Sequence, residues 1–378
     1  MKFMYLAASA ALGALLIGCG GTDATETAPP KPSQPPAAPP GETAPPGTTP
    51  TATTLAHPPM VPTAATIPAS TKSSTFAIRT LYMGDSPRGS QTREEDAWKK
   101  FGYDLDGVET TKAEPKQCKP LDGNEVIPDG DKGVDNAFGY ALLPTLSTVG
   151  TLLHKPTKNM TDAIARGEFT IMFQVTGLDD AASQTSTGLQ GQLFSGAKFD
   201  ATNSPAWNGL DAWPVDKELL VDGETVAGGS KIKFTDAFVT GGTWVNGSPT
   251  SMVVALTIGK FPFALRIQRA IVTAEHSAPN KLSNGVIAGV IAINDVLQSI
   301  DGVAGSINAS ACPGTPTHDL IVRLIRQAAD VRIDKAVEGD CDAISIGLGF
   351  EAESVAAPTA VAAAVAAPPN SCPPAATL

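Results

Sequence analysis

The feature that most constrains the fold is a series of short β-favouring runs in the middle of the chain, separated by glycine, asparagine and proline. Such regular spacing is typical of an antiparallel sheet and argues against alternating strand–helix units. We therefore predict a mainly β domain, an antiparallel β-sandwich or barrel-like fold with a few short helices. The predicted strands of this series are residues 168–177, 188–199, 213–221, 230–239, 251–258 and 261–273.

Further elements are predicted on both sides of this series. Glycines alternate with apolar residues in 343–350, which predicts a strand that another backbone approaches closely. The other predicted strands are 76–83, 98–104 and 286–293. Helices are predicted at 137–153, broken at Pro144, at 161–167, at 294–300, and from Thr317 onward, where Asp330 falls on the polar face.

The N-terminus carries a targeting signal. Lys2 precedes an apolar run over 6–17 that is too short to span a membrane, and a cysteine follows at position 19. This pattern resembles the bacterial lipoprotein signal. The resemblance implies a signal peptide over 1–18, a lipid on Cys19 and attachment to a membrane surface. Gly20 after the cysteine implies the outer membrane.

Composition divides the rest of the chain. Residues 19–74 are rich in Pro, Thr and Ala and cannot bury enough apolar surface to fold, so they are predicted to be a disordered tether. Residues 75–353 are the predicted globular domain, and residues 354–378 form an Ala- and Pro-rich tail. The formal charge of −11 excludes a nucleic-acid partner, which requires clustered Lys and Arg.

Four cysteines remain after Cys19, and an exported location permits two disulfides. No cysteine or histidine pair has zinc-site spacing, so a zinc site is not expected. Three pairings are possible. The shortest loop for Cys372 pairs it with Cys341, which leaves Cys118 for Cys312; a Cys312–Cys341 pair is the alternative.

An acidic, glycine-rich stretch runs over residues 101–139. Asp129, Asp131 and Asp135 occupy relative positions 1, 3 and 7 of a calcium-type loop, but Tyr140 stands where an EF-hand requires glutamate. Two interpretations remain, solvated turns whose aspartates bond their own backbone and an irregular calcium site. Its predicted ligands are Asp104, Asp106, Asp129, Asp131 and Asp135.

Two classes of function follow from the side chains. Trp207 and Trp244 lie in loop-like contexts, where they could stack on sugar rings, as expected of a binding module directed at a glycan or an envelope protein; partly buried packing is the alternative for each. The alternative is an anchored extracellular hydrolase that uses a carboxylate pair, because such a pair has no fixed spacing in sequence.

Segments 102–107, 133–139 and 341–350, together with the lipoprotein signal and the Pro-rich tether, resemble the uncharacterised lipoproteins of myxobacteria. This resemblance covers the domain over 75–353 and implies its location and architecture, but no activity. The expected role is therefore a binding or structural module of the cell envelope.

Overall fold

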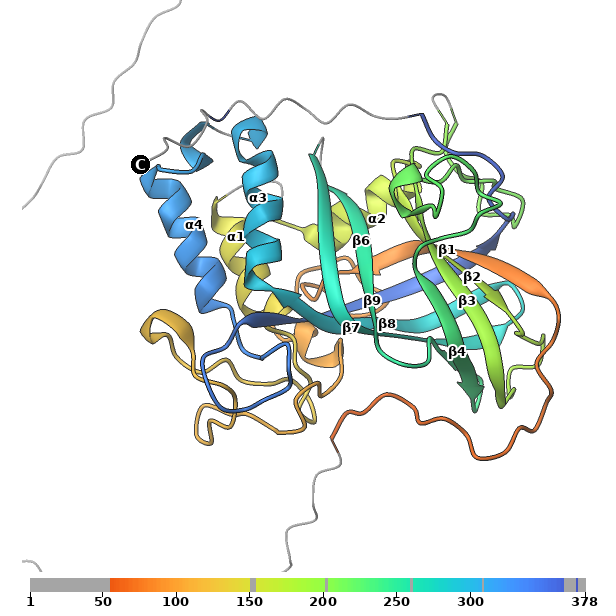
Figure 1. The fold of residues 1–378 in the computed structure, drawn as a ribbon, viewed down its shortest axis with the longest axis horizontal. Helices are drawn as coiled ribbons and strands as arrows, with labels where there is room; N and C mark the ends of the chain where they lie inside the picture. The colour runs from red at the N-terminus through yellow and green to blue at the C-terminus, as the bar shows by residue number, and fades with distance from the viewer. Residues whose placement is uncertain are drawn as a thin grey trace, which may run out of the picture. The chain divides into compact units, whose positions relative to one another are not determined.

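The computed structural model describes residues 55–149, 154–200, 203–258, 261–307, 309–363 and 372. Its strands are β1 (Ser73–Tyr82), β2 (Thr170–Thr176), β3 (Ser186–Gly196), β4 (Lys233–Thr240), β5 (Thr243–Val245), β6 (Thr250–Ile258), β7 (Phe261–Ala278), β8 (Lys281–Ala292) and β9 (Ala343–Val355). They form one antiparallel sheet in the order β5–β4–β3–β2–β1–β9–β8–β7–β6. Because β5 also pairs with β7, the eight strands other than β6 close into a barrel (Figure 1). Strand β6 pairs with β7 at the edge of the sheet. The predicted mainly β fold is confirmed.

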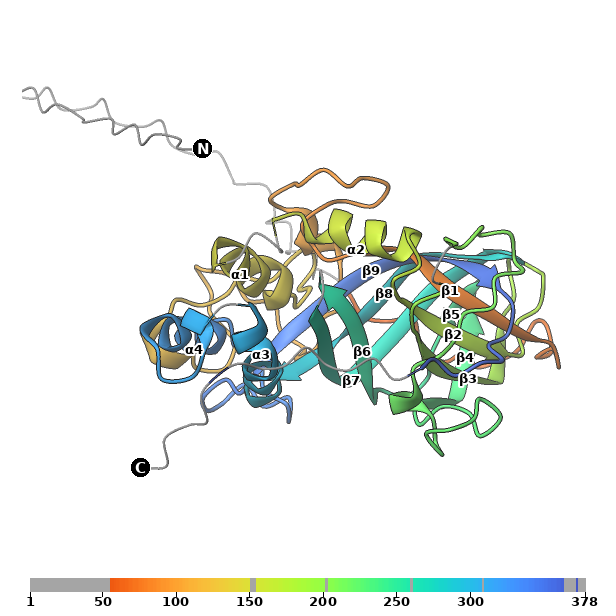
Figure 2. The same ribbon diagram turned by 90° about the horizontal axis from the view of Figure 1, so that it is seen from above.

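The helices are few. They are a π-helix at Phe138–Leu142, α1 (Leu143–Val149), α2 (Pro156–Ala165), α3 (Ile293–Ile307) and α4 (Pro316–Gln327). Helices α1, α3 and α4 gather at one end of the barrel, near the end of β8 and the start of β9, whereas α2 lies beside β1 (Figures 1 and 2). Within the described ranges, no helix is long and apolar enough to cross a membrane.

Three predicted elements differ from the structure. Residues 98–104 do not form a strand, because a 3-10 helix occupies Ala97–Lys100. Residues 213–221 are mostly loop; their apolar side chains pack on the outer face of β1–β3, so burial and not strand pairing explains their pattern. At Pro144 the helix does not end but changes type, because the π-helix that ends at Leu142 continues directly into α1 from Leu143.

Aromatic side chains fill the barrel. Phe173 lies between Phe350 and Trp244, at ring-centroid distances of 5.4 and 5.8 Å, and Trp244 also contacts Phe234 at 5.9 Å. All four side chains are at most 2% exposed. Alternate residues of each strand point inward, so the runs recognised in the sequence supply this core.

The acidic loop contacts β9 through two residues, Gly347 of the strand and Asn136 of the loop. A Cβ on Gly347 would overlap the carbonyl oxygen of Phe101, so only glycine permits this approach, as the alternating glycines predict. Asn136 lies beside it and is 2% exposed. Its side chain donates toward the carbonyl oxygens of Trp98, Phe101 and Gly347 and accepts from the amides of Gly139 and Gly347.

All four remaining cysteines are paired, but not as predicted. The disulfides are Cys118–Cys341 and Cys312–Cys372, so the shortest-loop argument was wrong. The physical reason is local pairing, since Lys119 forms a parallel bridge with Asp340 and places Cys118 next to Cys341. Two disulfides indicate an oxidising, exported location.

Both ends of the domain extend beyond the predicted boundaries. On the N-terminal side, Asp104 donates its amide to Ala56 at 2.9 Å, and Ser70 donates to Gly177 at 3.1 Å. On the C-terminal side, Ala356 donates to Asp211 at 3.0 Å. These contacts hold parts of the predicted tether and tail against the barrel, whereas Cys19 and the signal peptide lie outside the described residues.

Candidate metal centre

The acidic loop packs on the outer face of the barrel. Tyr103 and Leu105 join a small apolar cluster with Ala288 and Val290 of β8. The Tyr103 hydroxyl also forms a 2.7 Å hydrogen bond with the Thr273 hydroxyl on β7. The burial of Tyr103 and Leu105 in this cluster holds the loop segment that carries Asp104 and Asp106 against the barrel.

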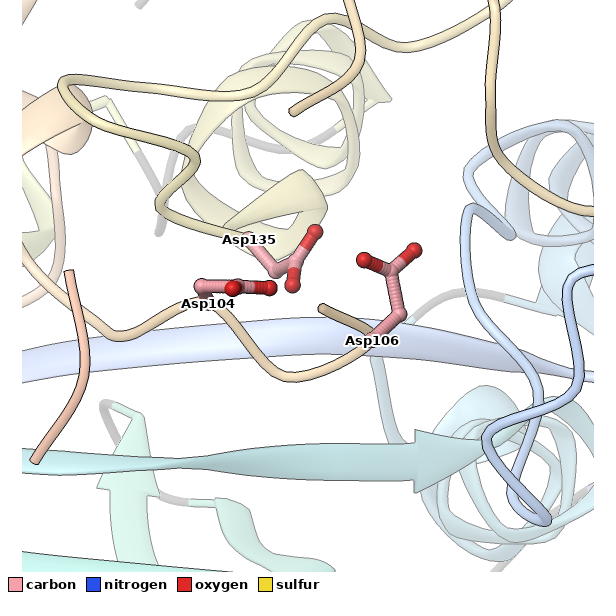
Figure 3. A group of neighbouring side chains, drawn as sticks. All are labelled: Asp104, Asp106 and Asp135. Carbon is pink, nitrogen blue, oxygen red and sulfur yellow. The ribbon is translucent and has the colours of Figure 1, made fainter. Parts of the chain in front are cut away.

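Three carboxylates of the loop come together. Asp104, Asp106 and Asp135 each offer an oxygen, and these oxygens all lie within 4.8 Å of one another. Figure 3 shows the carboxylates of Asp104 and Asp135 side by side, with Asp106 next to Asp135. Asp104 is 6% and Asp135 2% exposed, while Asp106 is half-buried. This group could hold a metal ion.

Backbone amides orient each carboxylate of the group. Asp104 accepts from Gly107 at 2.7 Å, Asp106 from Val108 at 3.0 Å, and Asp135 from Leu105 at 2.6 Å. The last bond joins the two parts of the loop, which are thirty positions apart in the sequence. Each of these bonds uses one oxygen, so the second oxygen of each carboxylate is available to a ligand.

Asp104 carries an oxygen without a hydrogen-bond partner. Its side chain is fully buried, and Oδ2 accepts no hydrogen bond from any described residue. The imidazole Nδ1 of His57, on a side chain that is 57% exposed, lies 3.7 Å from this oxygen. A buried carboxylate oxygen without a donor is costly unless a cation or proton neutralises it.

Burial shifts two of the three carboxylates, those of Asp106 and Asp135, toward the neutral form when no cation is bound. Burial raises the pKa of Asp106 to about 6, and the charge of Asp104 adds to the increase. Burial also raises the pKa of Asp135 well above its usual range, with further contributions from Asp106, Asp330 and Asp129. A bound cation would reverse this preference, because it stabilises the ionised form.

The structure does not place all five predicted ligands in one group. Asp129 lies near the group and repels it, but its Oδ2 accepts from the amide of Thr110 at 2.6 Å, and burial raises its pKa to about 8. Asp131 is exposed and lies outside the group of three. Alternating aspartates suggested a single run of ligands, but the turns between them point Asp131 to solvent.

One acidic residue near the group was assigned to the wrong environment. Asp330 follows α4 and was predicted on its polar face, yet it is 4% exposed and accepts from the amide and hydroxyl of Ser345 on β9. Burial raises its pKa to about 7, despite these hydrogen bonds. Its position after the last helical turn was the available signal, because helical periodicity no longer applies there.

Asp330 should make the metal-free protein less stable as the pH rises. In the folded state it keeps its proton up to about pH 7, whereas the unfolded chain loses it near 3.8, so the free energy of unfolding falls between these values. The shift corresponds to at most about 4 kcal/mol. Urea unfolding in chelator from pH 4 to 8 measures this slope. Asp330→Asn should make the slope smaller, leaving the part that Asp106, Asp129 and Asp135 contribute through their own raised pKa values, and the exposed Asp131→Asn should leave it unchanged; equal slopes in all three proteins would contradict this assignment.

The two tryptophans considered as ligand-binding residues, Trp207 and Trp244, differ in burial. Trp244 is fully buried inside the barrel and cannot stack on a sugar, which corrects that prediction; the strand β5 that holds it is too short to be recognised from sequence. Trp207 is half-buried, packs against Trp213 at a centroid distance of 6.1 Å, and lies under the guanidinium of Arg79 at 5.7 Å.

Comparison of the chain with protein-family models, with curated proteins and with solved structures finds no match.

Proposed function

We propose that this protein is a lipid-anchored module of the cell envelope, held to the outer membrane through Cys19, whose barrel domain is stabilised by one calcium ion. The observation that carries the proposal is the buried group of Asp104, Asp106 and Asp135, with an Asp104 oxygen that has no hydrogen-bond donor. The two disulfides support export, and the resemblance of the N-terminus to a lipoprotein signal supports the anchor.

Calcium suits the donor set. All three members of the group offer carboxylate oxygens, and hard divalent cations prefer such oxygens. Calcium also tolerates irregular geometry better than magnesium does, so a loop without EF-hand spacing is acceptable. Half-exposed Asp106 leaves one side of the group open to water, which would complete the coordination.

Calcium should raise the thermal unfolding midpoint of the oxidised protein. A ligand present at one hundred times its dissociation constant adds about 2.7 kcal/mol of stability. Asp104→Asn and Asp135→Asn should remove this increase, and the matched control Asp131→Asn should retain it. A midpoint that is the same in calcium and in chelator for the unsubstituted protein would overturn the proposal.

We propose a neutral glycan as the ligand of this module. A groove of about 680 Å³ lies outside β2 and β3, and Gln174, Gln192 and Glu224 line it with groups that hydrogen-bond hydroxyls. Val226 and Val361 of the groove belong to the same apolar cluster as Trp207. The described lining includes no basic residue, so an anionic ligand is less suited to it.

Removal of one amide should weaken glycan binding about tenfold, the value for a loss of roughly 1.4 kcal/mol. Gln192→Ala should do so for neutral oligosaccharides immobilised on an array, whereas Gln190→Ala, exposed on the same strand, should not. If both variants bind the immobilised oligosaccharides equally well, or if the unsubstituted protein does not bind them, the proposal of a glycan ligand is contradicted.

Neither the candidate metal group nor the groove outside β2 and β3 suits the alternative hydrolase. A carboxylate pair that cleaves a substrate must face an accessible cavity, but the side chains of Asp104 and Asp135 are buried. The groove outside β2 and β3 contains one carboxylate, that of Glu224.

A further inference from the structure

Arg269 lies at an irregular point of β7, close to the carboxylate group. The pairing of β7 with β8 skips one residue between Gln268 and Ile271, which marks a β-bulge, and Arg269 has a left-handed φ of 51° there. Its neighbour Ala270 points into the barrel core. The charges that act on Arg269 belong to Asp135, Asp106, Asp334 and Asp342, all outside the barrel. The bulge therefore turns this side chain toward the acidic loop.

The Arg269 guanidinium is buried without a hydrogen-bond partner. All three of its nitrogens are inaccessible to solvent, and none donates to a described residue, although the residue as a whole is half-buried. Two of the four aspartates are already engaged: Asp334 pairs with Arg332 at 2.8 Å, and Asp342 accepts from the amide of Ile333. The positive charge of Arg269 interacts most strongly with Asp135 and Asp106, two members of the candidate metal group, ahead of Asp334 and Asp342.

The charges of Arg269 and of the three carboxylates determine which cation charge leaves the site neutral. Three ionised carboxylates and one guanidinium leave two negative charges, and one divalent cation cancels them, while the neighbouring Asp129 and Asp330 hold their protons because burial raises their pKa values to about 8 and about 7. A trivalent cation would leave a buried positive charge, which is costly in a region of low dielectric. Without Arg269 the balance would change, because a trivalent cation would then be the neutral match.

We propose that Arg269 determines the charge selectivity of the site, so that it discriminates against trivalent cations in favour of divalent ones. This inference rests on the proposed calcium site. Arg269 does not contact the cation in this account; it acts through the field it imposes on Asp106 and Asp135. Lysine at this position would preserve the selectivity, since the same charge would remain.

The test compares calcium and lanthanum binding. Each ion is titrated calorimetrically into the metal-stripped mature chain, which carries Cys19→Ser so that it is obtained without lipid. Arg269→Gln and Arg269→Leu both remove the charge, Arg269→Lys keeps it, and Arg266→Gln removes an exposed charge of the same strand. Far-UV circular dichroism identifies the variants that fold.

Loss of the Arg269 charge should raise the preference for lanthanum over calcium at least tenfold. Arg269→Lys and Arg266→Gln should keep the preference of the unsubstituted protein. If that protein binds calcium and the neutral variants keep the same ratio, the role of Arg269 is refuted while the calcium site stands. If the unsubstituted protein binds neither ion, the proposed calcium site itself is refuted and the inference with it.

Discussion

Replacement of Cys118 and Cys341 together by alanine is expected to lower the free energy of unfolding by about 5 kcal/mol, because the disulfide closes a loop with a sequence separation of 223. The bond also joins the acidic loop to the segment just before β9. The domain should therefore lose both a long-range constraint on its unfolded chain and the local connection of its candidate metal site.

The second disulfide provides the matched comparison. Cys312 and Cys372 are separated by 60 residues, so their replacement by alanine should cost about 1 kcal/mol less. Urea unfolding of the two double variants, with intact disulfides elsewhere, measures the difference. A smaller loss for the Cys118–Cys341 pair than for the Cys312–Cys372 pair would contradict this account, as would reactive thiols at Cys118 and Cys341 in the unsubstituted protein.

Asn136→Ala is expected to destabilise the domain by about 4 kcal/mol. The two N–H donors of the side chain are shared among three carbonyl oxygens and its oxygen accepts from two amides, so it makes at most four buried hydrogen bonds at once, each worth about 1 kcal/mol, and its removal leaves the carbonyl and amide of Gly347 without these partners. Asn136→Asp should cost a similar amount, because a carboxylate would face three carbonyl oxygens. The effect should extend to the metal site, since Asp135 is the preceding residue.

Asn124→Ala is the control for this effect. The Asn124 side chain donates one hydrogen bond, to the carbonyl oxygen of Gln327, and is partly exposed, so its loss should cost about 1 kcal/mol. Urea unfolding of both variants in chelator isolates the hydrogen bonds from any bound cation. Similar losses for the two variants would show that Asn136 is not the junction between the loop and β9.

Much of the fold was predictable because it depends on local patterns. Apolar alternation, broken by glycine and asparagine, located most of the strands, and capping residues and helical periodicity indicated segments that overlap all four α-helices, although α3 ends seven residues beyond its predicted end. It did not locate β5, whose three residues lie next to Gly241 and Gly242, nor could it distinguish a barrel from a sandwich. Closure depends on the pairing of Thr243–Val245 with β7, a contact that no periodicity encodes.

The candidate site was predictable in region but not in detail. An excess of aspartate and glycine indicates where carboxylates gather, yet the choice of Asp104, Asp106 and Asp135 depends on which side chains the loop turns inward. The hydrogen bond from the Leu105 amide to the Asp135 carboxylate holds Asp135 beside the segment that carries Asp104 and Asp106. Arg269 is more than a hundred residues away in sequence, and only its bulge on β7 directs it to the loop, so no motif could have included it.

The most direct measurement of the central claim is the number of calcium ions bound per chain, determined by equilibrium dialysis of the metal-stripped, oxidised protein. We expect one ion per chain, with a dissociation constant of about 10⁻⁴ to 10⁻³ M, the range of extracellular calcium modules. Asp104→Asn should bind none under the same conditions, and Asp131→Asn should still bind one. No bound calcium in the unsubstituted protein, or one ion still bound by Asp104→Asn, would contradict the account.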